Sequence, residues 1–281
     1  MNNHHQNHNI EAEVRQALAE DIGSGDITTS LIKNTATVKA TVISREPGIL
    51  CGIPWFSEAF RQLDSNIMIN WMLQDGDSIT ANQIICTLFG SAVPILTGER
   101  TGLNFLQTLS STATIAHAYA TAILGLPTKI LDTRKTIPGL RNAQKYAVRC
   151  GGCHNHRYGL YDGILIKENH ILAAGSITQA IQQAKRNNPK NLPIETEVEN
   201  LIEFQEALDA VADIILLDDF QISDLIKAVE LNQKRAKLEA SGGINLGNVR
   251  QVAETGVDYI SIGALTKDIK AIDLSMRFQY T

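Results

Sequence analysis

This sequence has no long hydrophobic run, few cysteines and no overall excess of positive charge. The longest apolar runs, such as residues 214–217, are far too short to span a bilayer, and no apolar stretch follows the polar residues 1–9 as in a secretory signal. Four cysteines in 281 residues do not suggest a disulfide scaffold. These absences predict a globular protein of the reducing cytoplasm, without a membrane partner, in which residues 1–9 are disordered.

A local cluster of positive charge interrupts this acidic chain, whose formal net charge is −5. Positions 134 to 167 hold seven basic residues against one acid: Arg134, Lys135, Arg141, Lys145, Arg149, Arg157 and Lys167, opposed by Asp162. Focused positive potential offsets the cost of dehydrating a small, multiply anionic ligand. Nucleic acid fits less well, since the sequence pI is about 5.8. A solvated helix face would explain Arg141, Lys145 and Arg149, but for the others we predict an anion pocket.

From about residue 128 onward, apolar strand-like runs alternate with amphipathic stretches. The predicted strands are 128–131, 163–166, 193–198, 213–217, 236–240 and 258–262. The predicted helices between them include 177–186, 201–210, 224–231 and 246–255. Most of these strands recur roughly every 20–30 residues, the rhythm of βαβ units with a parallel sheet. Six such units favour a barrel or near-barrel over a dinucleotide-binding sheet.

The first part of the chain follows another pattern. Strands are predicted at 38–44 and 67–71, and the residues at 46–48 and 75–77 have turn chemistry. A long helix is predicted from about 99 to 124, with small residues that would let it pack closely within the fold or against another subunit. We place a domain boundary at residue 112, beside or inside this helix.

Polar residues lie at the carboxyl ends of the predicted strands, where barrel enzymes have their active sites. In chain order they are Asp132-Thr133-Arg134, Lys167, Glu195 and Glu197, Asp218-Asp219, Glu239 and Ser241, and Ser261 to Gly263. Because side chains alternate along a strand, Glu195 and Glu197 share one face. Six consecutive strands that end in this way predict an active site.

Glycine turns and carboxylates add detail to this prediction. Ser241-Gly242-Gly243 and Ile262-Gly263-Ala264 follow the last two strands, and their backbone N–H groups suit a phosphate, although tight turns alone would also explain them. Glu197 and Asp218 oppose the basic residues from neighbouring strands. Such carboxylates beside phosphates commonly hold Mg²⁺, and a salt bridge to Lys167 or Arg134 is compatible with that role.

Two alternatives stay open at this point. Cys150-Gly151-Gly152-Cys153-His154 has the spacing of covalent haem attachment, and His154 with His156 could complete a zinc set. The absent export signal and the basic surroundings argue against both, and we predict free thiols at Cys150 and Cys153. The other alternative is a phosphate-binding aldolase or isomerase barrel with Lys167 as a Schiff-base lysine, which the dense arginine set disfavours.

Several motifs in unbroken order, from about residue 11 to the end, carry a family resemblance. They lie at 26–29, 98–104, 132–141, 155–160, 165–170, 195–199, 216–218, 241–244 and 260–266. The segment 132–141, DTRKTIPGLR, and the segment 156–170 are the most specific. These motifs resemble quinolinate phosphoribosyltransferase, also called carboxylating nicotinate-nucleotide pyrophosphorylase. Two positions depart from the family pattern: Asp219, where asparagine is usual, and Cys153, where glycine is common.

The resemblance implies a reaction, a fold and an assembly. Quinolinate and phosphoribosyl pyrophosphate would give nicotinate mononucleotide, pyrophosphate and carbon dioxide, with Mg²⁺, in the biosynthesis of NAD. The implied fold is an α/β sandwich at 1–112, an open, incomplete α/β (TIM-like) barrel at 113–270, and a C-terminal segment at 271–281 that packs back on the first domain. The implied assembly is a homodimer, alone or within a larger oligomer, in which one N-terminal domain caps the partner's barrel.

The resemblance also implies roles for single residues. Quinolinate would be held by Arg134, His156, Arg157 and Lys167, and by Arg100 of the partner subunit. Thr133 would also bind substrate, and Lys135 would contact a phosphate or a carboxylate. Lys135, Lys167, Glu197 and Asp218 would be catalytic, and the two acids would also bind the ribose and hold Mg²⁺ directly or through water. The loops at 241–243 and 262–264 would bind the 5′-phosphate.

Overall fold

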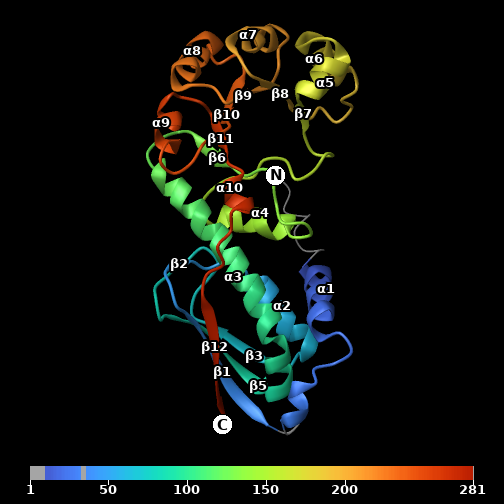
Figure 1. The fold of residues 1–281 in the computed structure, drawn as a ribbon, viewed down its shortest axis with the longest axis vertical. Coiled ribbons are helices and arrows are strands. Elements are labelled where there is room, and N and C mark those ends of the chain that lie inside the picture. The colour runs from blue at the N-terminus through green and yellow to red at the C-terminus, as the bar shows by residue number, and fades with distance from the viewer. Residues whose placement is uncertain (1–9, 33–35, 281) are drawn as a thin grey trace. The chain divides into compact units, whose positions relative to one another are not determined.

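The computed structural model describes residues 10–32 and 36–280, apart from the side chain of Tyr280. The predicted disorder of residues 1–9 lies outside these ranges. The chain divides into two compact units (Figure 1): Met1–His117 with Ile137–Gly152 and Asp268–Thr281, and Ala118–Thr136 with Cys153–Lys267. We call them the first and the second unit. The domain boundaries expected at residues 112 and 270 stay predictions.

A four-stranded antiparallel sheet forms one layer of the first unit, in the order β12-β1-β5-β3. The strands are β1 (Thr37–Ser44), β3 (Met68–Trp71), β5 (Ile84–Ser91) and β12 (Leu274–Tyr280). A second, two-stranded sheet pairs β2 (Gly48–Ile49) with β4 (Ser78–Ile79). Alternation along β1 buries Val38, Ala40 and Val42 on one face. The strands predicted at 38–44 and 67–71 are confirmed.

Helices form the other layer of the first unit. They are α1 (Ile10–Ile22), the short 3₁₀ helix η2 (Thr28–Leu31), α2 (Ile53–Leu63), α3 (Ala92–Ala122) and α4 (Arg141–Cys150). Phe56 and Phe60 of α2 and Leu106 of α3 join the apolar cluster of the sheet. A second apolar cluster unites α1 to α4 through residues such as Trp55 and Leu109. The first unit is therefore an α/β sandwich, as predicted.

The long helix α3 begins seven residues before the predicted start at 99 and packs closely within the first unit. A Cβ atom on Gly102 would lie 3.0 Å from Cε2 of Phe60. The Ser110 hydroxyl accepts a hydrogen bond from the backbone N–H of Cys51 at 2.9 Å and donates one to its carbonyl at 3.1 Å. Small residues on this helix therefore serve close packing inside the fold, one of the two explanations considered for them.

Helix α4 corrects one interpretation of the basic residues. Lys145 was expected on a solvated helix face, but its side chain is buried, whereas Arg149 is exposed and Arg141 is half-buried. The three residues are four positions apart and so lie on the same face of the helix. Exposure to solvent differs along this face, because the rest of the protein covers its middle, where Lys145 lies. A charge pattern does not reveal such a change.

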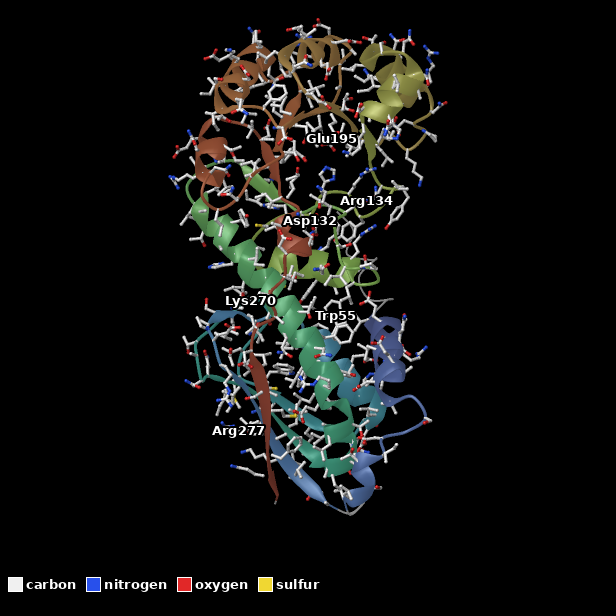
Figure 2. All side chains as sticks on the ribbon, in the orientation of Figure 1. Trp55, Asp132, Arg134, Glu195, Lys270 and Arg277 are labelled. Carbon is white, nitrogen blue, oxygen red and sulfur yellow. The ribbon has the colours of Figure 1, made fainter. Side chains whose placement is uncertain are left out.

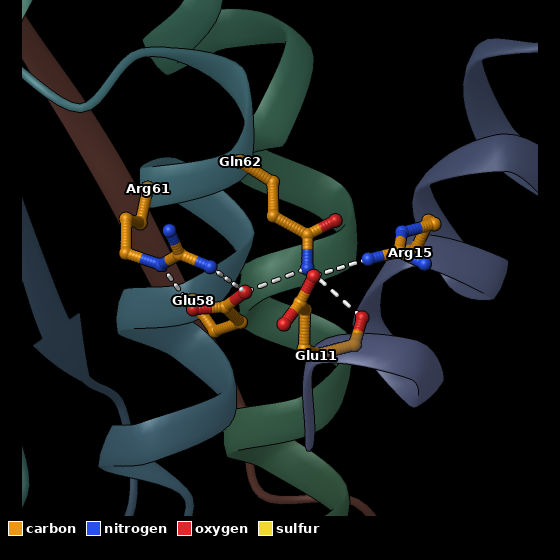
Figure 3. A network of polar contacts seen from close by, with 5 residues as sticks. All are labelled: Glu11, Arg15, Glu58, Arg61 and Gln62. Carbon is orange, nitrogen blue, oxygen red and sulfur yellow. Dashed lines mark hydrogen bonds and ion pairs between the residues drawn. The ribbon is translucent and has the colours of Figure 1, made fainter. Parts of the chain in front are cut away.

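A polar network joins α1 to α2 at the surface of the first unit (Figure 3). Arg61 donates two hydrogen bonds to the Glu58 carboxylate, at 2.5 and 2.6 Å. Gln62 donates to Glu58 at 2.7 Å and to the backbone carbonyl of Glu11 at 2.9 Å, and Glu11 also pairs with Arg15. Exposed ion pairs stabilise a protein by at most about 1 kcal/mol each. The network therefore aligns the two helices, and the apolar cluster beneath them provides most of the stability.

A six-stranded parallel sheet forms the core of the second unit, in the order β6-β11-β10-β9-β8-β7. The strands are β6 (Lys129–Leu131), β7 (Ile164–Ile166), β8 (Ile194–Val198), β9 (Ile214–Asp218), β10 (Lys237–Ser241) and β11 (Tyr259–Ser261). All six predicted strands are confirmed. Among the described residues β6 and β7 do not pair with each other, so the sheet is the predicted open, incomplete barrel.

Helices follow most of these strands, and α5 to α9 lie along the outer side of the sheet (Figure 1). They are α5 (Glu168–Ala174), α6 (Ile177–Arg186), α7 (Leu201–Asp209), α8 (Ile222–Asn232), α9 (Val249–Glu254) and α10 (Ala264–Lys267). Ser176 and Asn200 cap α6 and α7, since their side chains accept hydrogen bonds from N–H groups of the first turn. Within the described ranges, no helix has the length and apolarity that crossing a membrane requires.

Candidate active site

The carboxyl ends of the barrel strands bring two acids and two lysines together. Lys167, directly after β7, forms an ion pair with Glu197 of β8. Burial raises the pKa of Asp218, at the end of β9, and the charge of Glu197 raises it further, whereas Lys167 and Lys135 lower it. The four groups therefore lie within electrostatic range of one another, although they come from four different strand ends.

Two arginines form a second cationic group in the same unit. Burial lowers the pKa of Arg157, and the nearby charge of Arg134 lowers it further, while Glu195 acts in the opposite direction. Arg157 donates a hydrogen bond to the carbonyl of Gly163 at 3.1 Å. Figure 2 shows Arg134 in the loop after β6 and Glu195 on β8. The structure thus brings the two predicted arginines together beside the face of β8 that carries the acids.

Asp132 holds the segment that carries His156 and Arg157. Its side chain is fully buried at the end of β6. One carboxylate oxygen accepts a hydrogen bond from the backbone N–H of His156 at 2.9 Å, and the other accepts one from Nδ2 of Asn155 at 2.6 Å. Hydrogen bonds to a buried charged group are among the stronger ones in proteins. Asp132 therefore fixes the position of the segment that contains Asn155, His156 and Arg157.

The ring of His156 is held between a backbone amide and two buried glutamates. Its Nδ1 accepts a hydrogen bond from the N–H of Arg157 at 2.7 Å, so the ring proton lies on Nε2. Nε2 lies 2.9 Å from Oε2 of Glu195 and 3.6 Å from Oε2 of Glu239. Burial raises the pKa of Glu239 to about 8, and the charge of Glu195 adds to this effect. Both ring nitrogens are thus engaged within the protein.

The sequence analysis placed Glu195 and Glu239 among the strand-end residues of the active site but gave neither an individual role. Both side chains are almost completely buried, and the Oε1 atom of each has no hydrogen-bond partner among the described residues. Each lies two positions before another predicted site residue, Glu197 or Ser241, and so faces the same side of the sheet, but the sequence did not predict their burial.

The glycine turn after β10 packs against the loop after β9. Gly242 has a φ angle of +89°, and a Cβ atom there would lie 2.1 Å from Oδ1 of Asp219. The N–H of Asp219 donates to the carbonyl of Ser241 at 2.9 Å, and Asp219 itself has a φ angle of +55°. Gly243 follows in a left-handed conformation, with a φ angle of +59°. Only glycine fits at position 242, because a side chain would displace the neighbouring loop.

The turn after β11 packs against the loop after β6. The N–H of Ile262 donates to the carbonyl of Leu131 at 2.9 Å, and a Cβ atom on Gly263 would lie 3.1 Å from Cδ of Lys135. The backbone N–H of Lys135 donates to the Thr133 hydroxyl at 3.1 Å. The predicted phosphate turn, which ends at Ala264, the first residue of α10, thus lies beside two predicted substrate contacts.

The alternative metal or haem set is not supported. None of the four cysteines forms a disulfide bond. Burial raises the pKa of Cys153 to about 12. The backbone of His154 forms a single parallel bridge with Leu131. Among the described residues, neither Cys153 nor His154 belongs to a group of three potential metal ligands.

The open barrel and its polar strand ends define a class of protein. Cations, paired carboxylates and glycine turns meet at the carboxyl edge of a parallel sheet, and this is the arrangement of an α/β-barrel enzyme for an anionic, phosphorylated substrate. Arg100 lies on α3 of the first unit. Its predicted contact is with another subunit.

Comparisons with known proteins give the family. The model for the N-terminal domain of quinolinate phosphoribosyl transferase matches residues 26–110, and the model for its C-terminal domain matches residues 112–277. A Synechocystis protein named as a probable carboxylating nicotinate-nucleotide pyrophosphorylase is 41% identical over 271 residues, which are 95% of this chain and 92% of that protein. The chain therefore belongs to the quinolinate phosphoribosyltransferase family, and the predicted resemblance is confirmed.

Solved structures agree with this assignment. The nicotinate-nucleotide pyrophosphorylase from Francisella tularensis is 49% identical, with a TM-score of 0.93 over 96% of each chain. NadC from Streptococcus pyogenes is 37% identical, with a TM-score of 0.94 over 97% of each chain. The similarity thus covers both units and nearly the whole length of the chain.

Proposed function

We propose that this chain transfers the phosphoribosyl group of phosphoribosyl pyrophosphate to quinolinate, with decarboxylation, in the biosynthesis of NAD. The products are nicotinate mononucleotide, pyrophosphate and carbon dioxide. One observation carries the proposal in a chain of this family: Arg134 and Arg157 lie near each other and near Glu195 of β8, and the carboxylates of Glu197 and Asp218 lie at the ends of the neighbouring strands β8 and β9. The first pair suits a dicarboxylate ring, and the second suits a ribose that becomes positively charged.

The arginine pair supports the binding of quinolinate. Burial disfavours the charge of Arg157, and repulsion by Arg134 adds to this cost. A ligand with two carboxylates offsets both costs. An arginine presents a planar fork to a carboxylate and so fixes the orientation of the ring as well as its charge. In this proposal Lys167, Lys135 and Thr133 complete the polar wall around the substrates, and His156 keeps its neighbour Arg157 in position.

The acid pair supports the transfer step. The pyridine nitrogen forms a bond to C1′ of the ribose while the bond from C1′ to pyrophosphate breaks. Positive charge then develops on the ribose, and a carboxylate held beside it stabilises this charge without reorganisation. Glu197 and Asp218 are the acids we propose for this role. Lys167, paired with Glu197, holds that carboxylate in place.

The same two acids fit a magnesium ion. They offer hard oxygen donors. Burial and the charge of Glu197 raise the pKa of Asp218, and a bound cation would relieve the repulsion between the two acids. We propose that Glu197 and Asp218 hold Mg²⁺ directly or through water. When bound, Mg²⁺ neutralises charge on the pyrophosphate leaving group. The backbone of the turns at 241–243 and 262–264 is proposed to bind the 5′-phosphate.

Decarboxylation follows from the product of the transfer. The ring nitrogen, now quaternary, withdraws electrons from the adjacent ring carbon. The carboxylate on that carbon leaves as carbon dioxide, its bonding pair stays on the ring, and a proton takes its place. We propose further that the protein acts in the cytoplasm as a homodimer, in which Arg100 of the partner subunit joins the quinolinate site.

A direct assay tests the proposal. Purified protein is mixed with quinolinate, phosphoribosyl pyrophosphate and Mg²⁺, and nicotinate mononucleotide is measured by chromatography and mass spectrometry. Absence of this product at every pH near neutral would refute the proposal. Borohydride treatment in the presence of carbonyl substrates tests the alternative aldolase, since a Schiff base on Lys167 would be trapped as a stable adduct.

The variant Arg134→Ala tests the division of the site. We expect the KM for quinolinate to rise about 30-fold or more, because loss of one partner of a desolvated ion pair costs at least about 2 kcal/mol. The KM for phosphoribosyl pyrophosphate should change far less. Arg141→Ala, at the half-buried start of α4, is the matched control and should leave both constants close to those of the wild type. Equal effects of Arg134→Ala on both substrates would contradict the assignment.

A further inference from the structure

Two cysteines of the first unit meet beside a carboxylate. Cys51 lies between β2 and α2, and Cys150 is the last residue of α4. Their Sγ atoms and one carboxylate oxygen of Asp75 all lie within 4.8 Å of one another. Cys51 is fully buried, whereas Cys150 is partly exposed. We propose that Cys150 and Cys51 form an oxidation site, at which a peroxide converts the two thiols into a reversible disulfide.

Contacts on both sides hold the two sulfurs near each other. Oδ1 of Asp75 accepts hydrogen bonds from the N–H groups of Gly52 at 3.0 Å and Ile53 at 3.1 Å, which follow Cys51 directly. Oδ2 of Asp75 accepts a hydrogen bond from the Tyr146 hydroxyl at 2.7 Å, one helical turn before Cys150. One carboxylate therefore ties the turn of Cys51 to the helix of Cys150. This preorganisation favours a bond between the two sulfurs.

The environments of the two thiols differ in a way that assigns their roles. The pKa of Cys150 is lowered, chiefly by a hydrogen bond from Cys51 and further by Tyr146 and Arg149, although burial and the charge of Asp75 act in the opposite direction. Burial raises the pKa of Cys51 well above its usual range. The thiolate is the form that reacts with peroxide, and it must also be accessible. Cys150 is therefore the attacking residue, and Cys51 is the resolving one.

The reaction has two balanced steps. The Cys150 thiolate attacks one peroxide oxygen, the O–O bond breaks, and the released hydroxide takes up a proton to become water, which leaves a sulfenic acid. The Cys51 sulfur then attacks the Cys150 sulfur, the S–O bond breaks, and the hydroxyl leaves with the thiol proton as a second water. Two thiols are oxidised, and one peroxide is reduced.

Two other outcomes are less well supported by the surroundings. Cys153 follows Cys150 by three positions, but it is buried and its pKa is raised to about 12, which disfavours its thiolate. A metal ion would need a ligand from Asp75, whose carboxylate already accepts three hydrogen bonds. The thiol pair therefore points to redox chemistry. This inference does not depend on the transferase activity, because its test measures only the thiols.

The test begins with the unmodified full chain, so it does not depend on whether a variant folds. The reduced protein is treated with hydrogen peroxide, remaining thiols are alkylated, and the protein is digested without reductant. Trypsin leaves Cys51 in the peptide 46–61 and both Cys150 and Cys153 in the peptide 150–157. We expect these two peptides linked through Cys51 and Cys150, and separated again by dithiothreitol. A link within 150–157, a link through Cys153, or four alkylated thiols would overturn the proposal.

Variants then separate the two roles. In Cys51→Ser the sulfenic acid on Cys150 cannot be resolved, so labelling by dimedone should rise at least about tenfold over the wild type. Cys150→Ser should abolish the link and the labelling. Cys153→Ser is the matched control and should keep both the link and its rate of formation. Loss of the link in Cys153→Ser, or unchanged dimedone labelling in folded Cys51→Ser, would contradict the assignment of Cys51 as the resolving thiol.

Discussion

Gly242 lies where the loops after β9 and β10 touch, and two separate constraints act on it. Its φ angle of +89° is strained for residues with a side chain, and a Cβ atom would lie 2.1 Å from Asp219 Oδ1. Gly125 in the same unit has the same φ angle of +89°, but a Cβ atom there would meet nothing within 4 Å. The pair of glycines therefore separates the effect of the clash from that of backbone strain.

We expect Gly242→Ala to weaken the binding of phosphoribosyl pyrophosphate, because the turn must move away from Asp219. Backbone strain and displacement together should cost about 1–3 kcal/mol, a rise in KM of roughly 5- to 150-fold. Gly125→Ala, the matched control, should lower stability slightly and leave KM unchanged. Steady-state kinetics check both variants. A similar KM for the two would mean that the turn after β10 does not bind this substrate.

Glu239 should make the protein less stable as pH rises. Its pKa is about 8 in the folded protein, above the value of about 4.5 expected for the unfolded chain. The folded state therefore binds the extra proton between these values, and the stabilisation is complete below about pH 4.5 and lost as pH rises through about 8. The effect is on the order of a few kcal/mol.

The variant Glu239→Gln isolates this contribution, because it removes the titrating proton but keeps the shape of the side chain. We expect the midpoint of thermal unfolding to fall less between pH 5 and pH 8 in Glu239→Gln than in the wild type. Glu230→Gln, on the exposed side of α8, serves as the control and should retain the wild-type dependence. Parallel curves for Glu239→Gln and the wild type would show that Glu239 is already ionised near neutral pH.

At the scale of elements, Asp132 connects the end of β6 to the segment that follows Cys153. A similar pair of hydrogen bonds, from one backbone N–H and one asparagine side chain to an aspartate, occurs in a surface turn of the first unit. There Oδ1 of Asp64 accepts hydrogen bonds at 2.9 Å from the backbone N–H and from Nδ2 of Asn66. Asp132 is fully buried, whereas Asn66 is exposed. Water can replace the hydrogen bonds to Asp64 at the surface but not those to the buried Asp132.

We expect Asp132→Asn to cost about 1.5–3 kcal/mol of stability, because an amide would place a donor against either Asn155 or the N–H of His156. The segment that bears Arg157 should then move, so the KM for quinolinate should rise as well. Thermal unfolding and steady-state kinetics measure the two effects. Asp64→Asn is the control, expected to change neither by much. Unchanged kinetics in a folded Asp132→Asn protein would show that the hydrogen bonds of Asp132 do not position the site.

Periodicity predicted the elements whose pattern is local. The six barrel strands are apolar runs between turn residues. The boundaries of helix 177–186 follow from its amphipathic spacing and from the capping residue Ser176. The edge strand β12 was not predicted as a strand, because its partner β1 is more than two hundred residues away in the sequence. Burial of Lys145 was missed for a related reason, since only tertiary packing covers the middle of that face of α4.

At the scale of the whole molecule, the site could be predicted as a group because strand ends of a parallel sheet meet at one edge. That rule brought Lys167, Glu197 and Asp218 together from positions far apart in the sequence. It could not give the proton on His156 or the shared burial of Glu195 and Glu239. Those depend on contacts across strands, where the shift between neighbouring strands decides which side chains touch.

The proposed dimer makes the sharpest prediction at this scale, because it requires two chains to build one site. Arg100→Ala and Lys167→Ala should each be inactive alone. When the two variants exchange subunits, one site of each mixed dimer has neither substitution. Random exchange makes such sites about a quarter of the total, so roughly a quarter of wild-type activity should return. Native mass spectrometry confirms the exchange. Mixed dimers without activity, or an Arg100→Ala enzyme with the kinetics of the wild type, would show that each barrel completes its own site.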